Sequence, residues 1–405
     1  MTIKEYVDKN LPLSIRYTPE DKGNLLGLPK PYIVPCVADL FQEMYYWDTY
    51  FANTGLIIRG DVEQAKNNVD NLLHLLNRFG FVLNGNNTYY IYNSQPPFLA
   101  QMIREVYDES GDKQWLSKVY ETLKKEHKFW QEKRMTECGL NRYCCEELPE
   151  NEVKGCSQAI IGRLGFRPEG KTDKELAYAY RTAGESGWDL TPRLTWEGYD
   201  YAALDLNVLL YNQEKQLSYF AEELGNNEDA LIWQKHFVER AKKMREYLKG
   251  EDGLFYDYNV NRREVNGIFS VASFYPLFFN MATEEEAKAA VAALSRLEME
   301  HGVATCEKCD TQGTYQWAYP NGWPSMQRIM VEGLLNYGYV EEAKRIARKY
   351  VEVVETNYVQ TGHLWEKYNV VDGSVRVVNE YDMPAMLGWT FGTYYYCCKI
   401  LGRTV

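Results

Sequence analysis

The sequence predicts an all-α fold, a toroid of paired helices, and two observations lead to it. Amphipathic helical stretches recur along the 405 residues, and most come in pairs joined by a short turn that contains Gly or Asn. Each pair has one mainly apolar and one charged helix, as expected where inner helices pack around an axis and outer helices face water. Six such hairpins of about 65 residues would use the whole chain. We therefore predict an (α/α)6 toroid of paired helices, formed as a single catalytic domain over residues 1–405, with its functional loops on one face.

The expected helices are placed by the spacing of apolar residues and by the turns between them. Apolar residues from Val62 to Leu73 recur at helical spacing, for example. Gly111 and Gly225 stand between neighbouring helical stretches, where glycine commonly ends a helix. The predicted helices are Asp61–Leu76, Lys113–Met135, Gln213–Leu224, Asn227–Leu248, Glu284–Leu297, Met326–Tyr337 and Val340–Tyr358.

Segments rich in Gly, Pro, Asn and aromatic residues separate these hairpins. We expect them to be loops, and loops at one end of a rigid scaffold commonly carry function. No low-complexity linker divides the chain, so the sequence gives no reason to place a domain boundary. The expected loops are Gly27–Asp39, Phe81–Pro97, Arg181–Trp196, Glu307–Pro324 and Gly362–Thr390.

Charge and composition limit the partners that the chain can have. The formal net charge is -12, and a surface this acidic repels phosphate backbones and acidic lipids, so neither nucleic acid nor a membrane is an expected partner. The chain contains 33 Tyr, 10 Trp and 15 Phe. Aromatic faces pack against the flat C–H faces of sugar rings, and Tyr adds a hydroxyl, although many aromatics simply fill cores. A small neutral saccharide is the expected partner, and the oligomeric state is not indicated.

The first residues and the cysteines suggest an intracellular setting. Charged residues such as Lys4 and Asp8 interrupt the amino-terminal stretch, which lacks the apolar run of a signal peptide. No segment approaches the roughly 18 apolar residues of a membrane span. Nine cysteines cannot all pair within the chain, and thiols are the usual state in a reducing compartment. We expect a cytoplasmic protein.

Five strings in the expected loops carry the chemistry. They are EMYYWDTYF (43–51), NGNNTYYIYNSQPP (84–97), ESGWDLTPR (185–193) with LDLN (204–207), QWAYPNGWP (316–324), and WEKYNV (365–370) with EYDMPAMLGWTFG (380–392). In this order, the strings resemble the trehalase family of glycoside hydrolases. The resemblance runs from about Pro31 to Gly392, and it implies an inverting α-glycosidase on a six-hairpin α/α toroid, with no cofactor and no metal.

The resemblance assigns roles residue by residue. Asp189 in ESGWD matches the catalytic acid of the family, and Glu366 in WEKYN matches its catalytic base. Arg181 matches an arginine that contacts the substrate, and Glu380 matches a further carboxylate of the pocket. The remaining substrate-binding positions implied are Phe41, Tyr46, Trp47, Asp48, Asn84, Gln95, Glu185, Gly187, Trp188, Gln316, Trp317 and Trp389.

The chain also departs from the family pattern. Gln42 and Asn93 stand where the family has arginines, while Ala318 and Asn369 replace aspartates. An arginine fork holds sugar hydroxyls with a geometry that Gln or Asn cannot copy. The catalytic pair is therefore retained, whereas recognition of the second sugar is expected to differ. This leaves trehalose or another small α-glucoside as the expected substrate.

The chemistry of the two carboxyls supports the same roles. Glycoside hydrolysis needs one protonated carboxyl to give its proton to the leaving oxygen and one ionised carboxylate to activate water. Trp188 next to Asp189 is expected to desolvate that carboxyl and raise its pKa, as an acid requires. Alternatively, Asp189 caps a following helix, and Glu366 is a surface residue paired with Lys367.

Other interpretations of the sequence remain open. Cys306 and Cys309 form a lone CxxC, whereas zinc sites usually need a second pair or two histidines. Histidine-dependent sugar epimerases also use α/α toroids, but only His363 lies in one of the expected loops. The alternatives to trehalase-like hydrolysis are an α-glucosidase or mannosidase that acts on a different aglycone, such as a glycosyl-glycerate, and a sugar-binding protein without turnover.

Overall fold

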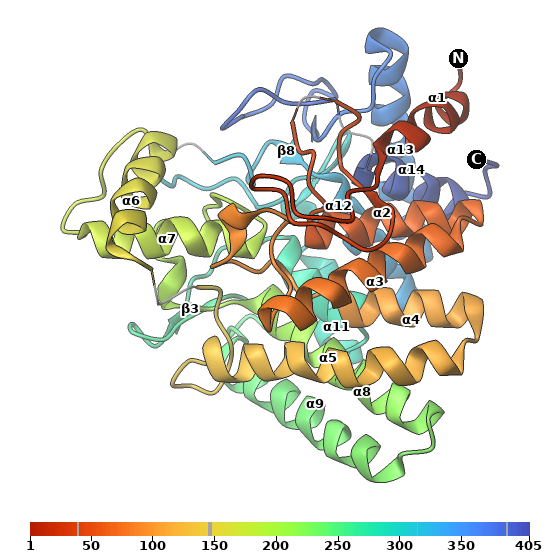
Figure 1. The fold of residues 1–405 in the computed structure, drawn as a ribbon. Helices are drawn as coiled ribbons and strands as arrows, with labels where there is room; N and C mark the ends of the chain where they lie inside the picture. The colour runs from red at the N-terminus through yellow and green to blue at the C-terminus, as the bar shows by residue number, and fades with distance from the viewer. Residues whose placement is uncertain (39, 145–147, 314, 386–387) are drawn as a thin grey trace.

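The computed structural model describes residues 1–38, 40–144, 148–313, 315–385 and 388–405 (Figure 1). Helices form most of the regular structure in this part of the chain, and every strand that it contains is two residues long. The predicted all-α toroid is confirmed. The prediction of a single domain rests on the sequence, and the apolar core is consistent with it, because one continuous buried cluster runs from Ile3 to Cys398.

An inner ring of helices forms the centre of the molecule. Each inner helix packs against the next one in the ring, and the last packs back against the first, so the carboxyl-terminal helix closes the ring (Figure 1). Gly392 in the last helix is needed for this closure, because a Cβ atom there would lie 1.9 Å from the carbonyl oxygen of Phe51. The inner helices are α2 (Tyr46–Arg59), α4 (Leu99–Ser110), α8 (Leu204–Glu223), α10 (Tyr275–Phe278), α12 (Pro324–Asn336) and α14 (Gly388–Ile400).

Outer helices follow five of the inner ones along the chain. Their charged faces point to solvent and their apolar stripes cover the ring, which is the amphipathic pattern seen in the sequence. Each predicted helix coincides with an observed one to within a few residues, except that Glu284–Leu297 is helical only to Ala292 and Gln213–Leu224 is the second half of α8. The outer helices are α3 (Val62–Phe79), α5 (Lys113–Lys133), α9 (Asn227–Tyr247), α11 (Glu284–Ala292) and α13 (Val340–Thr361).

A further hairpin lies beside the ring. Helices α6 (Glu150–Leu164) and α7 (Asp173–Ser186) pack on each other and extend to one side of the molecule (Figure 1). They have a small core of their own, which includes Leu176 and also Leu190 and Ala318 from the loops. The hairpin therefore rests on the segments that carry the third and fourth motif strings.

The expected loops need two corrections. The string 43–51 was placed among the loops, but Tyr46–Phe51 forms the first turns of α2. The expected loop Arg181–Trp196 begins inside α7, which ends at Gly187 in the left-handed conformation. Helices α2 and α7 were both missed. In α2, the run from Tyr46 to Leu56 is buried on all sides, so it lacks an amphipathic period.

Two short strands bring distant motif strings together. Strand β8 (Asn321–Gly322) pairs antiparallel with β9 (Tyr368–Asn369). Gly322 allows the close approach, since a Cβ atom there would lie 2.2 Å from the Val370 side chain. This pairing places the string QWAYPNGWP beside WEKYNV, and so sets Trp317 near Glu366.

Helix α1 (Ile3–Asn10) covers part of the same body. Thr2 caps it through a reciprocal bond pair with Glu5, and Arg59 of α2 pairs with Asp8 at 2.5 Å. The charged residues near the amino terminus are therefore part of a folded helix. In the described ranges, we find no helix with the length and apolar character that crossing a membrane requires.

Candidate active site

A cavity of about 340 Å³ opens on the face of the toroid where the motif strings meet. Both predicted catalytic residues, Asp189 and Glu366, contribute to its wall. The other predicted residues that line it are Phe41, Trp47, Asp48, Asn84, Gln95, Arg181, Gly187, Trp317 and Trp389. Segments from near both ends of the chain thus form one site, which local spacing alone does not show.

The backbone at Asp189 is held in an unusual conformation. Gly187 ends α7 with φ 70°, and Asp189 has φ 42°, which is uncommon for a residue with a side chain. A Cβ atom at Gly187 would lie 2.8 Å from the Trp47 indole, so the turn needs glycine for space as well as for conformation. The turn directs Asp189 into the cavity rather than onto a helix end, and its side chain remains 29% exposed there.

The environment of Asp189 suits a proton donor. Burial raises the pKa of Asp189 above its ordinary value, while the positive charge of Arg163 acts in the opposite direction. The Gln316 amide donates to Asp189 Oδ2 at 3.3 Å, and Arg163 lies 3.8 Å from Oδ1. A carboxyl with a raised pKa keeps its proton closer to neutral pH, which general acid catalysis requires.

Glu366 lies in a different environment. Its side chain is only 2% exposed, and both carboxylate oxygens accept hydrogen bonds, from Lys367 at 2.6 Å and from the Tyr381 hydroxyl at 2.7 Å. Burial raises the pKa of Glu366 above its ordinary value, and Lys367 and Tyr381 offset only part of this rise by stabilising the charged form. The Trp389 indole donates to the backbone carbonyl of Glu366 at 3.0 Å and fixes the position of the residue. The surface ion pair expected as the alternative is excluded, because Lys367 is itself completely buried.

Two more carboxyls share the site. Burial raises the pKa of Asp48 to about 8, and the charges of Glu366 and Asp189 add to this shift. Burial also raises the pKa of Glu380 to about 8, with a further contribution from Asp189. Like charges this close do not all ionise. At neutral pH, Asp48 therefore keeps its proton for most of the time and can donate a hydrogen bond to a sugar hydroxyl, whereas Glu380 lies outside the cavity wall beside Arg163.

Tryptophans form the floor of the cavity. Trp317 stacks on Trp323 with ring centroids 3.7 Å apart and planes 4° from parallel. Trp47 lies 5.3 Å from Trp317, and the Trp389 ring stands almost perpendicular to both stacked rings. Flat apolar faces beside carboxyl groups are the usual surroundings of a bound sugar ring.

Some predicted residues do not line the cavity. Tyr46 was predicted to contact substrate, but its hydroxyl donates to Glu126 at 2.6 Å inside the helical ring, so the structure places Tyr46 outside the cavity wall. The Glu185 carboxylate accepts from Arg134 and from the backbone N–H groups of Ser94 and Cys144, and it supports the wall from behind. The other three predicted residues outside the lining are Trp188, which is completely buried, and Gln316 and Glu380, which contact Asp189 and Arg163.

The arginines differ from the expectation. Arg181 lines the cavity, but its guanidinium is already paired with Glu152 at 2.7 Å and with Asn93 at 3.0 Å. Gln42 accepts a hydrogen bond from Arg16 and donates to backbone carbonyls, so it does not replace the family arginine in the cavity. Sequence reasoning missed Arg163, which reaches the cavity from the end of α6 and pairs with Glu380 at 3.2 Å.

Other residues of the site that were not predicted to bind substrate are mainly aromatic, and most of them lie inside the quoted strings. Tyr381 follows the predicted Glu380 directly, but its contact with Glu366 becomes evident only once the chain is folded. Leu40, Tyr45, Tyr89, Tyr90, Asn93, Tyr180 and Trp323 also line the cavity.

Cys306 of the CxxC motif lies in the protein interior. It is 3.5 Å from both Thr191 Oγ1 and the Trp317 carbonyl. Among the residues that the structure describes, three or more ligand atoms lie within 4.8 Å of one another only at His127, Glu214 and His236. Glu214 is already bound by Arg240 there, with an Nη2–Oε1 distance of 2.8 Å.

The fold and the site together define a class of enzyme. Two carboxyls with different surroundings face one tryptophan-lined cavity on an α/α toroid, which is the arrangement of a glycoside hydrolase. A family model named Trehalase matches residues 4–402. The chain belongs to the trehalase family and is a glycoside hydrolase.

Individual relatives agree with this assignment. The periplasmic trehalase of Escherichia coli O1:K1 is 32% identical over 425 aligned residues, which cover 96% of this chain and 73% of the relative. The solved structure of the neutral trehalase Nth1 from Saccharomyces cerevisiae is 27% identical, with a TM-score of 0.78, and the match covers 95% of this chain and 76% of that one. A GH63 mannosylglycerate hydrolase from Thermus thermophilus, solved in complex with glucose, is 16% identical with a TM-score of 0.64, over 90% and 95% of the two chains, and shares the fold.

The comparisons correct the expected location. Curated relatives of this chain are named periplasmic trehalases, which contradicts the cytoplasmic location expected from the sequence. The charged residues near the amino terminus do not indicate where the protein is located, because Lys4 and Asp8 belong to the folded helix α1.

Proposed function

We propose that the chain hydrolyses α,α-trehalose with inversion at one anomeric carbon, with Asp189 as the general acid and Glu366 as the general base. The observation that carries the proposal is the contrast between the two carboxyls. The Asp189 side chain is partly exposed in the cavity, and Arg163 lies 3.8 Å from its carboxyl group. The Glu366 carboxylate, in contrast, accepts hydrogen bonds from Lys367 and Tyr381. Family membership and the trehalase names of the relatives support the choice of substrate.

The mechanism follows from these surroundings. Asp189 gives its proton to the glycosidic oxygen as the bond to the anomeric carbon breaks, so the leaving glucose departs as a neutral alcohol. Glu366 takes a proton from water as that water attacks the opposite face of the sugar. An inverting pair needs its carboxyl oxygens about 6.5–9.5 Å apart to leave room for this water. Asp189 ends the reaction ionised and Glu366 protonated, and exchange with solvent restores both.

The remaining residues bind and orient the sugars. The stacked Trp317 and Trp323 support the apolar face of the ring, and neutral Asp48 can donate to a hydroxyl. Arg163 offers a guanidinium beside Asp189, whereas Gln42 and Asn93 provide none. We infer that Arg163 provides part of the substrate binding that the family's arginines would provide at the positions of Gln42 and Asn93.

One observation favours a related substrate class as the second candidate. Arg181 is neutralised by Glu152, so fewer free charged donors surround the cavity than the family pattern implies. A different α-glucoside, with another leaving group in place of the second glucose, would need fewer such donors.

Initial rates on a panel of glycosides test the proposal. We expect trehalose to have a higher kcat/KM than maltose, nigerose, isomaltose, sucrose and mannosylglycerate, because the family and its named relatives point to it. A higher kcat/KM for another α-glucoside would contradict the trehalose assignment and favour the second candidate. Turnover of none of them by a folded protein would contradict hydrolysis itself.

A further inference from the structure

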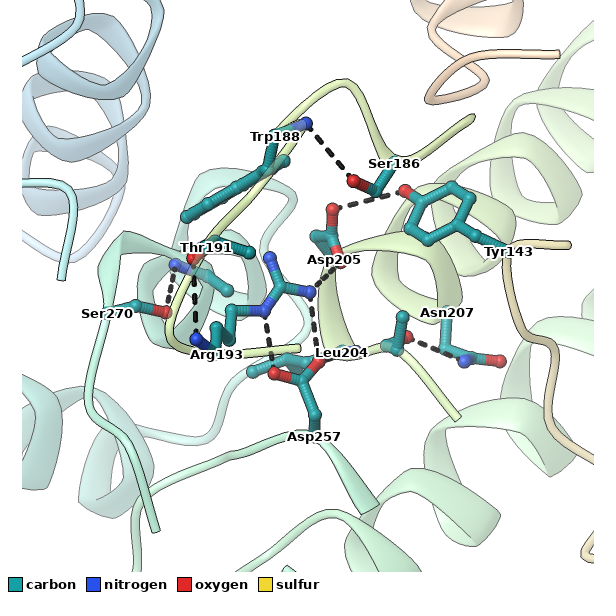
Figure 2. A network of polar contacts seen from close by, with 12 residues as sticks. Tyr143, Ser186, Trp188, Thr191, Arg193, Leu204, Asp205, Asn207, Asp257 and Ser270 are labelled. Carbon is teal, nitrogen blue, oxygen red and sulfur yellow. Dashed lines mark hydrogen bonds and ion pairs between the residues drawn. The ribbon is translucent and has the colours of Figure 1, made fainter. Parts of the chain in front are cut away.

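A buried charged cluster lies behind the catalytic turn, outside the cavity (Figure 2). At its centre is Arg193, whose side chain is completely buried. Arg193 Nε donates to Asp257 Oδ2 at 2.6 Å and Nη2 donates to Asp257 Oδ1 at 2.9 Å. The same Nη2 also donates to Asp205. None of these three residues contributes to the cavity wall, so substrate binding does not explain the cluster.

The partners of Arg193 are themselves fixed to the toroid. Asp205 lies in the first turn of α8 and accepts from the Tyr143 hydroxyl at 3.1 Å. Asp257 directly precedes strand β4 (Tyr258–Asn259) and accepts from the backbone N–H of Leu204 at 2.8 Å. The bidentate bond to Asp257 sets the plane of the guanidinium, because both atoms of the fork are engaged.

The face of this guanidinium supports the residue before the acid. The Arg193 Cζ atom lies 4.4 Å from the centre of the Trp188 ring, within the range of a cation–π contact. Trp188 is completely buried, and its ring is also 5.8 Å from Trp317. The indole is therefore enclosed between the charged cluster and the floor of the cavity. Figure 2 shows the side of the indole that faces the charged cluster.

Trp188 and Arg193 stand on either side of Asp189 in the chain. Asp189 adopts a left-handed backbone conformation that residues with a side chain rarely hold without support. Gly187 at φ 70° and Thr195 at φ 51° lie in the same segment and also have positive φ. A contact that joins the residue before Asp189 to one four positions after it closes this turn on itself and ties it to α8.

We propose that Arg193 is a positioning residue, which clamps the Trp188 indole and thereby holds Asp189 in its proton-donating orientation. The proposal rests on the proposed role of Asp189 as the acid. It assigns a function to Arg193, Asp205 and Asp257 that binding of substrate does not require. It also explains why an arginine is present, since the clamp needs a flat face and a bidentate edge at once.

Arg193→Lys tests the clamp while keeping the charge. Lysine can pair with one aspartate but offers neither a fork nor a flat face. Misplacement of a reacting group by about 1 Å can cost on the order of 10²-fold in rate, so we expect kcat on trehalose to fall by about that factor. KM should change little, because neither Arg193 nor Trp188 lines the cavity.

The pH profile separates positioning from simple stability. Activity needs protonated Asp189, whose pKa is raised by burial. If the turn loosens, water reaches this carboxyl and lowers its pKa, so the alkaline limb of kcat/KM should move to lower pH. The matched control is Arg240→Lys, since Arg240 is also buried and paired with a carboxylate, Glu214, but lies away from the catalytic turn.

The outcomes are distinct. A loss of kcat with a shifted alkaline limb in Arg193→Lys, and neither change in Arg240→Lys, supports the clamp. A lower Tm with unchanged kcat and pH profile in Arg193→Lys overturns it. If Arg193→Lys does not fold, the same measurements are made on Asp257→Asn, which breaks the bidentate bond and keeps the volume of the side chain. Unchanged kcat and an unchanged pH profile in Asp257→Asn overturn the clamp. Full activity of Asp189→Asn would instead overturn the proposed acid.

Discussion

Asp189→Asn is expected to lower kcat on trehalose by roughly 10³–10⁴-fold, the upper part of the range typical of a lost general acid. Asparagine has nearly the same size but no acidic proton, so the glycosidic oxygen would have to leave without protonation. The cavity should remain intact, because the hydrogen bond that the described residues make to the Asp189 side chain comes from Gln316 and is long, at 3.3 Å. The measurement is kcat and KM on trehalose, with the melting temperature as a check on folding.

A substrate with a different leaving group provides the control for Asp189→Asn. α-Glucosyl fluoride releases fluoride, which needs no proton to depart, so Asp189→Asn should hydrolyse it far better than trehalose when each is compared with the unchanged protein. Equal losses on both substrates would show that Asp189 does not act as the acid. Near-normal activity on trehalose would remove the residue from the mechanism altogether.

Glu366→Gln is expected to abolish turnover of both substrates, with a loss on the order of 10⁴-fold. Water must lose a proton as it attacks, whatever group leaves, so a good leaving group cannot rescue this variant. The amide of glutamine would also face the ammonium of Lys367, which now bonds to Glu366 at 2.6 Å. Rates on trehalose and on α-glucosyl fluoride measure the effect.

Glu126→Gln is the matched control for this change. Glu126 is also completely buried, and burial raises its pKa to about 8, so the neutral amide resembles the protonated acid already present. It bonds to Tyr46 and Gln213 away from the cavity. We expect Glu126→Gln to keep its activity. If it loses as much activity as Glu366→Gln, the loss reflects a disturbed interior rather than a missing base.

The outer helices were predictable from sequence, and several inner ones were not. The stripe from Val62 to Leu73 shows an amphipathic period because α3 has one face on the ring and one in solvent. Helix α2 has no such contrast, since Tyr46–Leu56 is buried on every side. Apolar spacing detects a boundary between core and water, and a helix that is buried on every side, such as α2, has no such boundary.

The site was predictable where a motif string carries the residue. Asp189 and Glu366 were predicted in that way as the catalytic pair, and both line one cavity. Arg163 was missed because its contact with Glu380 joins residues 217 positions apart, and nothing local to α6 indicates that contact. Tyr46 also lies in a motif string, but its hydroxyl points into the ring, toward Glu126, and not into the cavity.

The configuration of the first products tests the central claim most directly. Trehalose is hydrolysed in water enriched in ¹⁸O, and the anomers are followed by proton NMR and mass spectrometry before they equilibrate. Inversion by Asp189 and Glu366 predicts one β-glucose, which carries the ¹⁸O, for every unlabelled α-glucose that leaves. If the labelled product is α-glucose, the reaction proceeds with retention, and Glu366 does not act as the base that activates water on the opposite face of the sugar.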